Sequence, residues 1–206
     1  MGDDTFLTTP LTLVPHLLRI QLDGRVWSWS SLQPILYTGF VKMTDSVAGG
    51  EICPECGMRS GLGQPNCAAL RDVLLARDFE QPALYWKYHR LAVDTYCVQH
   101  SLYVESSKSL AAHLCGLCAA LEQNNDPNKL KRLQLWLDTH PKLPKPELPS
   151  FRGSLTIADV SGIDDPARYG RAVEAWARSA WEAYGKLQPI AREWLAMSAA
   201  RPASTR

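Results

Sequence analysis

Between residues 67 and 140, apolar side chains recur every three or four positions, and this spacing predicts a series of amphipathic helices. The first helix is expected over about residues 67–78, with Leu70, Val73 and Leu74 on its apolar face. Further helices are predicted from Pro82 to near His100, from Ser106 or Ser107 to about Leu121, and from Pro127 to just before His140. This part of the chain therefore predicts a run of helices joined by short turns.

The helical pattern resumes after a proline-rich interruption. Four prolines between residues 141 and 149 predict an extended connector. Arg152 follows as a candidate anion-binding side chain, and Thr156 with Asp159 has the spacing of a capping box for a short helix. A long helix is predicted from Asp165-Pro166 to Gly185, and a last one over residues 187–199. The chain is thus expected to be mainly α, a helical bundle.

The first 42 residues have a different pattern. They hold few charged residues, and their apolar residues keep neither the spacing of a helix nor that of a strand. Only Trp27 to Ser30 alternate as a short strand would. Met43 lies a few residues ahead of the metal motif described below and is a candidate for the natural first residue. We therefore predict an extension or poorly ordered arm over residues 1–42, a single helical domain over residues 43–200 and a tail over residues 201–206.

Composition narrows the class of protein. The chain has 206 residues, of which 46% are hydrophobic, and a formal net charge of +1. This suits one medium-sized domain and gives no basic field, so a nucleic-acid partner is not expected. No apolar run reaches the roughly 18 residues that a membrane span needs, and Asp3 and Asp4 stand where a signal peptide carries positive charge. We expect a cytoplasmic protein with reduced cysteines and no membrane partner.

A CPECG motif predicts a metal site. Its cysteines, Cys53 and Cys56, are separated by two residues and can present both sulfurs to one ion, while the glycine lets backbone amides turn toward them. Cys67, at the start of the first predicted helix, is the expected third ligand. His100 is the expected fourth, with Cys97 as its alternative. Three thiolates and one imidazole favour zinc, in a closed structural site.

A second group of polar residues lies on the next two predicted helices. His89, Asp94 and Tyr96 share the helix that ends near His100, and His113 would lie about opposite Asp94 if the third helix folds back. His89, Asp94 and His113 are candidate catalytic residues, as a general base with its orienting carboxylate or as ligands of a second metal. With Tyr96 they would line a polar pocket. The alternative is that a histidine bonded to an aspartate only satisfies packing.

Several of these motifs occur in a fixed order that resembles an uncharacterised bacterial family, a domain of unknown function. They are CPECG at 53–57, Cys67, HRLAVDTYCVQH at 89–100, SLAAHL at 109–114, RGSLTIADV at 152–160, and the helix with Trp176 and Trp181. The resemblance covers about residues 52–194 and implies a helical, metal-binding protein without a known activity. This chain departs from it at Leu187-Gln188, where the family tends to carry histidines.

Together these observations predict a cytoplasmic zinc-binding helical protein that acts as a binding or regulatory module for a small molecule or a protein. The alternative is a metal-dependent hydrolase or a small-molecule transforming enzyme that uses His89, Asp94 and His113. Nucleic-acid binding through the zinc motif is a third hypothesis, and the balanced charge disfavours it.

Overall fold

The computed structural model describes residues 20–22, 25–27, 51–61 and 63–200. The chain divides into two compact units, residues 1–46 and 47–206. In the first unit, strand β1 (Ile20–Leu22) pairs antiparallel with β2 (Arg25–Trp27). Of the strand predicted from Trp27 to Ser30, only Trp27 is described, at the end of β2. Nearly all of the predicted arm at 1–42 and the whole tail at 201–206 lie outside the described residues.

The second unit is mainly helical, as the sequence predicts. A short antiparallel pair, β3 (Glu51–Ile52) and β4 (Arg59–Ser60), comes first. The α-helices are α1 (Cys67–Glu80), α2 (Pro82–Gln99), α3 (Ser107–Glu122), α4 (Pro127–Leu137), α5 (Ala158–Ser161), α6 (Pro166–Ala183) and α7 (Gln188–Ala200). Single 3-10 turns, η2 (Ser101–Val104) and η3 (Gly185–Leu187), follow α2 and α6. No helix of the described ranges combines the length and the apolar character needed to cross a membrane.

Side-chain caps explain why several helices begin where they do. The Asn66 side chain accepts a hydrogen bond from the Ala69 amide at the start of α1, and Ser106 forms a capping box with Ser109 at the start of α3. Asp126 and Asp165 cap α4 and α6, each directly before a proline in the first turn. The sequence prediction relied on the signals at Ser106, Pro127 and Asp165-Pro166, whereas the Asn66 cap was not predicted.

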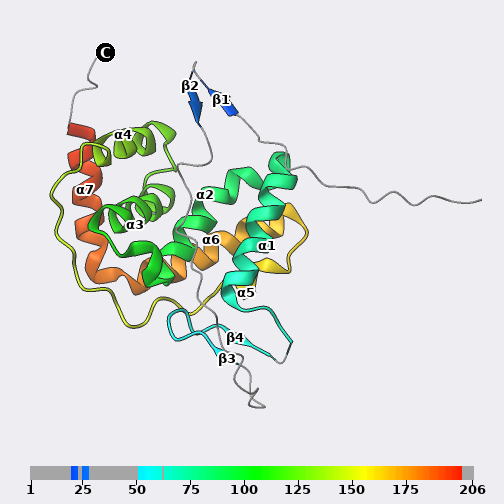
Figure 1. Cartoon of the computed structure of the whole chain (residues 1–206). Coiled ribbons are helices and arrows are strands. Elements are labelled where there is room, and N and C mark those ends of the chain that lie inside the picture. Colours follow the sequence, from blue (N-terminus) through cyan, green and yellow to red (C-terminus); the bar gives the residue numbers. More distant parts are fainter. Residues whose placement is uncertain (1–19, 23–24, 28–50, 62, 201–206) are drawn as a thin grey trace, which may run out of the picture. The chain divides into compact units, whose positions relative to one another are not determined.

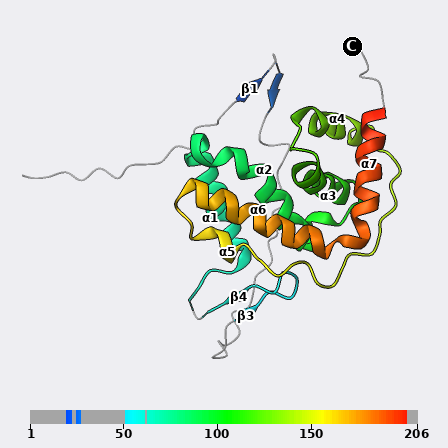
Figure 2. The same ribbon diagram turned by 180° about the vertical axis from the view of Figure 1, so that it is seen from behind.

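Buried side chains form two clusters within this unit. The cluster beside the CPECG turn, here called the knuckle-side core, gathers residues of α1, α5 and the β3–β4 hairpin. The other cluster, here called the far core, gathers residues of α3, α4 and α7. Both α2 and α6 contribute to each cluster. Figures 1 and 2 show the same division from opposite sides, with α3, α4 and α7 together and α1, α5 and the hairpin together. The metal motif therefore lies at one end of a helical unit and not on a separate module.

The buried face of α1 differs in detail from the predicted one. Leu74 and Asp78 are its buried residues, whereas Val73 is 59% exposed. Asp78 lies one turn after Leu74 on the same face, so a carboxylate occupies a position that the hydrophobic pattern assigns to the core.

Candidate metal centre

The CPECG motif forms a tight turn between β3 and β4. The Cys53 amide donates to the Met58 carbonyl over 2.9 Å, and the Gly57 amide donates to the Cys53 carbonyl over 3.0 Å. Gly57 has a φ of 74°, a left-handed conformation that glycine adopts without strain. Backbone amides of the turn point at the sulfurs: although burial raises the pKa of Cys53, hydrogen bonds from Cys56 and Glu55 lower it below its ordinary value.

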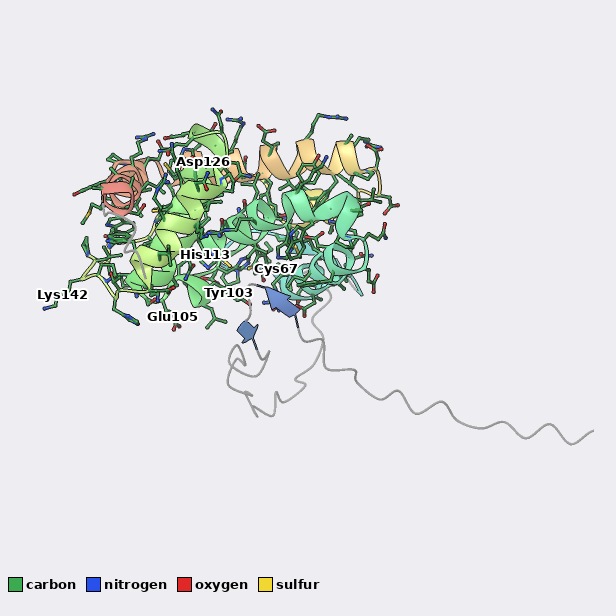
Figure 3. All side chains as sticks on the ribbon, turned by 90° about the horizontal axis from the view of Figure 1, so that it is seen from above. Cys67, Tyr103, Glu105, His113, Asp126 and Lys142 are labelled. Carbon is green, nitrogen blue, oxygen red and sulfur yellow. The ribbon has the colours of Figure 1, made fainter. Side chains whose placement is uncertain are left out.

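Two helix ends complete the group. Cys67 is the first residue of α1 and is labelled in Figure 3, and His100 follows the last residue of α2. One ligand atom from each of Cys53, Cys56, Cys67 and His100 lies within 4.8 Å of the others, and Cys53 Sγ is 3.9 Å from His100 Nε2. Tetrahedral zinc holds its ligand atoms roughly 3.5–3.8 Å apart, so small movements would suffice. His100, and not the alternative Cys97, completes the group.

His100 is oriented for ligation. Its Nδ1 lies 2.8 Å from the Tyr96 carbonyl oxygen, an acceptor that requires Nδ1 to carry the proton. The lone pair is thereby left on Nε2, the atom that faces Cys53. Burial lowers the pKa of His100, which favours the neutral imidazole that binds metals. The Tyr96 ring stacks on the imidazole with centroids 4.1 Å apart and fixes its plane.

The three sulfurs are too close together for all of them to be ionised at once without a cation. Burial raises the pKa of Cys56 to about 12, the Met58 amide opposes the rise, and the neighbouring Cys53 and Cys67 sulfurs add to it. The pKa of Cys67 is raised by burial and by Cys53 as well. A divalent cation would remove this repulsion by binding all three as thiolates. The donor set and its spacing thus fit a zinc ion.

An ion pair fastens the motif to the helices. Arg152 Nη1 donates over 3.0 Å both to the Glu55 carboxylate and to the Gln99 carbonyl. The Ser101 amide donates to the same carboxylate over 2.8 Å. Burial alone would raise the pKa of Glu55, but the hydrogen bonds of Ser101 and the charge of Arg152 bring it below its ordinary value. Arg152, the candidate anion-binding side chain, therefore pairs with a carboxylate of the metal motif.

Comparison with known proteins identifies the family. The model of DUF5946, described as a family of unknown function, matches residues 51–185, well over half of the chain. The chain belongs to DUF5946. The matched residues include all four members of the metal group. No curated protein matches the chain, and no solved structure matches it.

His89 and His113 of this DUF5946 protein each lie within hydrogen-bond distance of a different aspartate. His89 Nδ1 lies 3.0 Å from Asp78 Oδ2 on α1, and the His89 ring stacks on Trp86. His113 Nδ1 lies 2.9 Å from Asp94 Oδ1 between α3 and α2. The Tyr96 ring stacks on His100 of the metal group. The four residues thus take part in three separate sets of contacts, and a catalytic role for His89, Asp94 or His113 stays a prediction.

The Asp94–His113 pair is built into the contact between α2 and α3. Asp94 is buried, and Arg90 donates to its second oxygen over 2.8 Å. A Cβ at Gly116 would lie 1.9 Å from Asp94 Oδ2, so only glycine leaves room for the carboxylate. Burial lowers the pKa of His113, but Asp94 and the Cys97 thiol more than compensate and raise it to about 9. At neutral pH the imidazole of this DUF5946 protein is therefore protonated.

The sequence did not predict the roles of three residues that lie in or beside the candidate site, Asp78, Glu55 and Gln99. Asp78 could have been found, because it falls on the apolar face of α1. Glu55 and Gln99 gave no local signal: Glu55 reads as a turn residue, and its partner Arg152 is 97 positions away. Gln99, fully buried, receives the Trp176 indole N–H on its side-chain oxygen over 2.9 Å.

Proposed function

We propose that this DUF5946 protein binds one zinc ion through Cys53, Cys56, Cys67 and His100 and acts in the cytoplasm as a binding or regulatory module. One observation carries the proposal: four ligand atoms from three separate parts of the chain lie within 4.8 Å of one another. Such convergence of three thiols and an oriented imidazole is typical of structural zinc sites.

The proposed ion is structural and not catalytic. Four protein donors fill a tetrahedral coordination sphere, which leaves no position for a reacting water. Cys56 and His100 are buried, and Met58 of the same turn belongs to the knuckle-side core. Zinc would therefore tie the hairpin to the start of α1 and the end of α2. All six cysteines are free thiols, which suits a reducing compartment such as the cytoplasm.

A surface hollow beside the motif supports the binding role. It has a volume of about 330 Å³ and is lined by residues 54–57, 150–154 and Thr156. Phe151, which is 62% exposed, offers an apolar wall, and Arg152 also lines the hollow. The hollow joins the metal motif to the segment before α5, so a ligand seated there would contact both.

The test is metal content. We expect elemental mass spectrometry of the purified full chain to find one zinc ion per chain, lost in Cys56→Ser and retained in His113→Ala. A chelator that strips the ion should lower the melting temperature by several degrees, because zinc binding is coupled to folding. Purified protein that contains no metal, and gains none when zinc is added, would contradict the proposal.

The alternative enzyme function is favoured by one observation, the 2.9 Å contact between His113 Nδ1 and the buried carboxylate of Asp94. The same measurement separates the two functions. A second metal ion that is lost in His113→Ala while the first remains would place a metal-dependent hydrolase ahead of the binding module.

A further inference from the structure

The hollow beside the metal motif has a wall that is fixed by hydrogen bonds. The CPECG turn forms one side, and the segment of residues 150–156 forms the other. The amides of Ser154 and Leu155 both donate to Ser179 Oγ on α6, over 2.7 and 3.1 Å. Gly153, at a φ of 117°, lets the segment lie close to α6, because a Cβ there would be 3.0 Å from the same hydroxyl. This side of the hollow is thus preformed, as ligand sites usually are.

Two charged side chains line the hollow, Glu55 and Arg152. Arg152 Nη1 donates to Glu55 and to the Gln99 carbonyl, its Nε donates to the Pro149 carbonyl over 3.4 Å, and its side chain is only 12% exposed. Glu55 is more open, at 28%. In the described part of the chain, every hydrogen bond to this carboxylate ends on Oε1. The described residues therefore leave Oε2 free for a ligand.

The charges around the hollow favour a cation over an anion. The positive charge of Arg152 is shared between the Glu55 carboxylate and the carbonyl of Gln99, the last residue of α2, where the helix dipole is negative. Arg152 thus meets more negative charge than it neutralises. The proposed zinc centre adds to this, since three thiolates and one divalent cation carry one net negative charge and Cys56 also lines the hollow.

An apolar wall narrows the class of ligand further. Phe151 is largely exposed, and the face of a phenyl ring attracts a cation that lies within about 6 Å of its centroid. The volume of about 330 Å³ is at the lower end of the roughly 300–1,000 Å³ that is usual for small-molecule sites. The hollow therefore suits a small molecule or a single side chain that joins a positive charge to an apolar stem.

We propose that this hollow binds a primary ammonium group on a short apolar stem, as found in a free alkylamine or in a lysine side chain. The ammonium donates to Glu55 Oε2, and the stem packs on Phe151. The inference rests on the proposed binding role of the protein and names the chemistry of what is bound.

A series of matched ligands tests the charge preference on the wild-type chain. The isotope-labelled full chain is titrated with n-butylammonium chloride, n-butanol and sodium butyrate, and amide chemical shifts are followed by NMR. We expect butylammonium to shift the amides of Gly153 and Ser154 and to bind about tenfold more tightly than butanol, because a hydrogen bond to a charged partner is the stronger one. Butyrate has the same stem and the opposite charge, so it should bind more weakly still.

A further ligand separates the two sources of the ammonium group. Nα-acetyl-lysine methylamide presents the lysine side chain as it occurs in a protein. Tighter binding of this compound than of butylammonium would identify a protein lysine as the source, and the reverse order would identify a free amine. Either order supports an ammonium site.

Variants test the two contacts. Glu55→Gln keeps the shape but removes the charge, and we expect butylammonium affinity to fall by about tenfold. Glu51→Gln, on the same hairpin but outside the hollow, is its control. Phe151→Leu keeps an apolar side chain without a ring face and should cost about twofold to fivefold in affinity. Phe79→Leu, which removes an exposed ring outside the hollow, should change nothing.

Three results would overturn the proposal: no amide shifts around the hollow, butanol or butyrate binding as tightly as butylammonium, or an unchanged affinity in folded Glu55→Gln. The ligand series needs no variant to fold. Zinc content is measured on the same samples. A zinc-free chain that binds butylammonium would contradict the zinc proposal and leave this one standing, whereas a zinc-loaded chain that does not bind it would contradict this one alone.

Discussion

At the scale of single residues, orientation decides what the metal group can do. His100 could bind through either nitrogen, and the Tyr96 carbonyl selects Nε2 by accepting from Nδ1. The Tyr96 side chain also acts on Cys67, because it lowers the pKa of that thiol and so opposes part of the rise that burial causes. One residue therefore influences two of the four ligands, through its backbone and its side chain.

This double role makes Tyr96 testable. Tyr96→Phe keeps the carbonyl and the ring that stacks on His100 but removes the hydroxyl that favours the Cys67 thiolate. We expect zinc affinity to fall by about tenfold, the usual cost of losing a polar group that supports a metal ligand. Competition against a fluorescent chelator measures the change. Tyr88→Phe, a substitution on the same helix outside the metal group, is the control; equal affinities in both variants would contradict the role assigned to Tyr96.

At the scale of elements, α2 and α3 pack around a charge and not only around apolar side chains. Asp94 of α2 fills the space that Gly116 leaves on α3, and His113 closes over it. A buried ion pair of this kind is costly to break, because one partner is then left without compensation. The stability that this contact provides should therefore depend both on the size of the side chain at position 116 and on pH.

Gly116→Ala should lower the free energy of unfolding by about 1–3 kcal/mol through the clash with Asp94. Part of the loss should depend on pH. The His113 pKa is raised from 6.5 to about 9, so its stabilising contribution is complete below about pH 6.5 and disappears as pH rises through 9. The difference in unfolding free energy between variant and wild type, measured by urea titration, should therefore narrow as the pH rises over that window. Gly162→Ala, where a Cβ meets nothing within 4 Å, is the control; a gap independent of pH would argue against the pair.

At the scale of the whole helical unit, Gln99 joins segments that are distant in sequence. Its Nε2 donates to the carbonyls of Arg152 and Leu155 over 2.9 and 2.8 Å, and its oxygen accepts from Trp176 of α6. The side chain is fully buried. It therefore ties α2, the segment before α5, and α6 together beside the metal group.

Gln99→Leu has nearly the same volume but leaves those carbonyls and the indole N–H without their partner. We expect a loss of about 2–4 kcal/mol in unfolding free energy, since each buried polar group left unsatisfied costs about 1–3 kcal/mol. Urea denaturation followed by tryptophan fluorescence measures it. Gln134→Leu, on an exposed face of α4, should change stability little. Similar values for the two variants would show that the Gln99 bonds do not hold the unit together.

The sequence by itself determined what depends on neighbouring residues. Helix starts were predictable because caps such as Ser106 and Asp165 act within one turn. The paired cysteines of the CPECG turn were predictable for the same reason. Cys67 and His100 were also found, because a short turn between α1 and α2 returns the end of one helix to the start of the other.

Only the tertiary structure decided which side chain meets which across a distance. The sequence placed His89 with Asp94 and His113, but packing of α1 on α2 gave it Asp78 instead. Glu55 and Arg152 meet across 97 positions, and Gln99 and Trp176 meet across 77. Periodicity fixes the face of a helix on which a residue lies, but the partner on that face depends on how the helices pack, and that packing is a property of the whole fold.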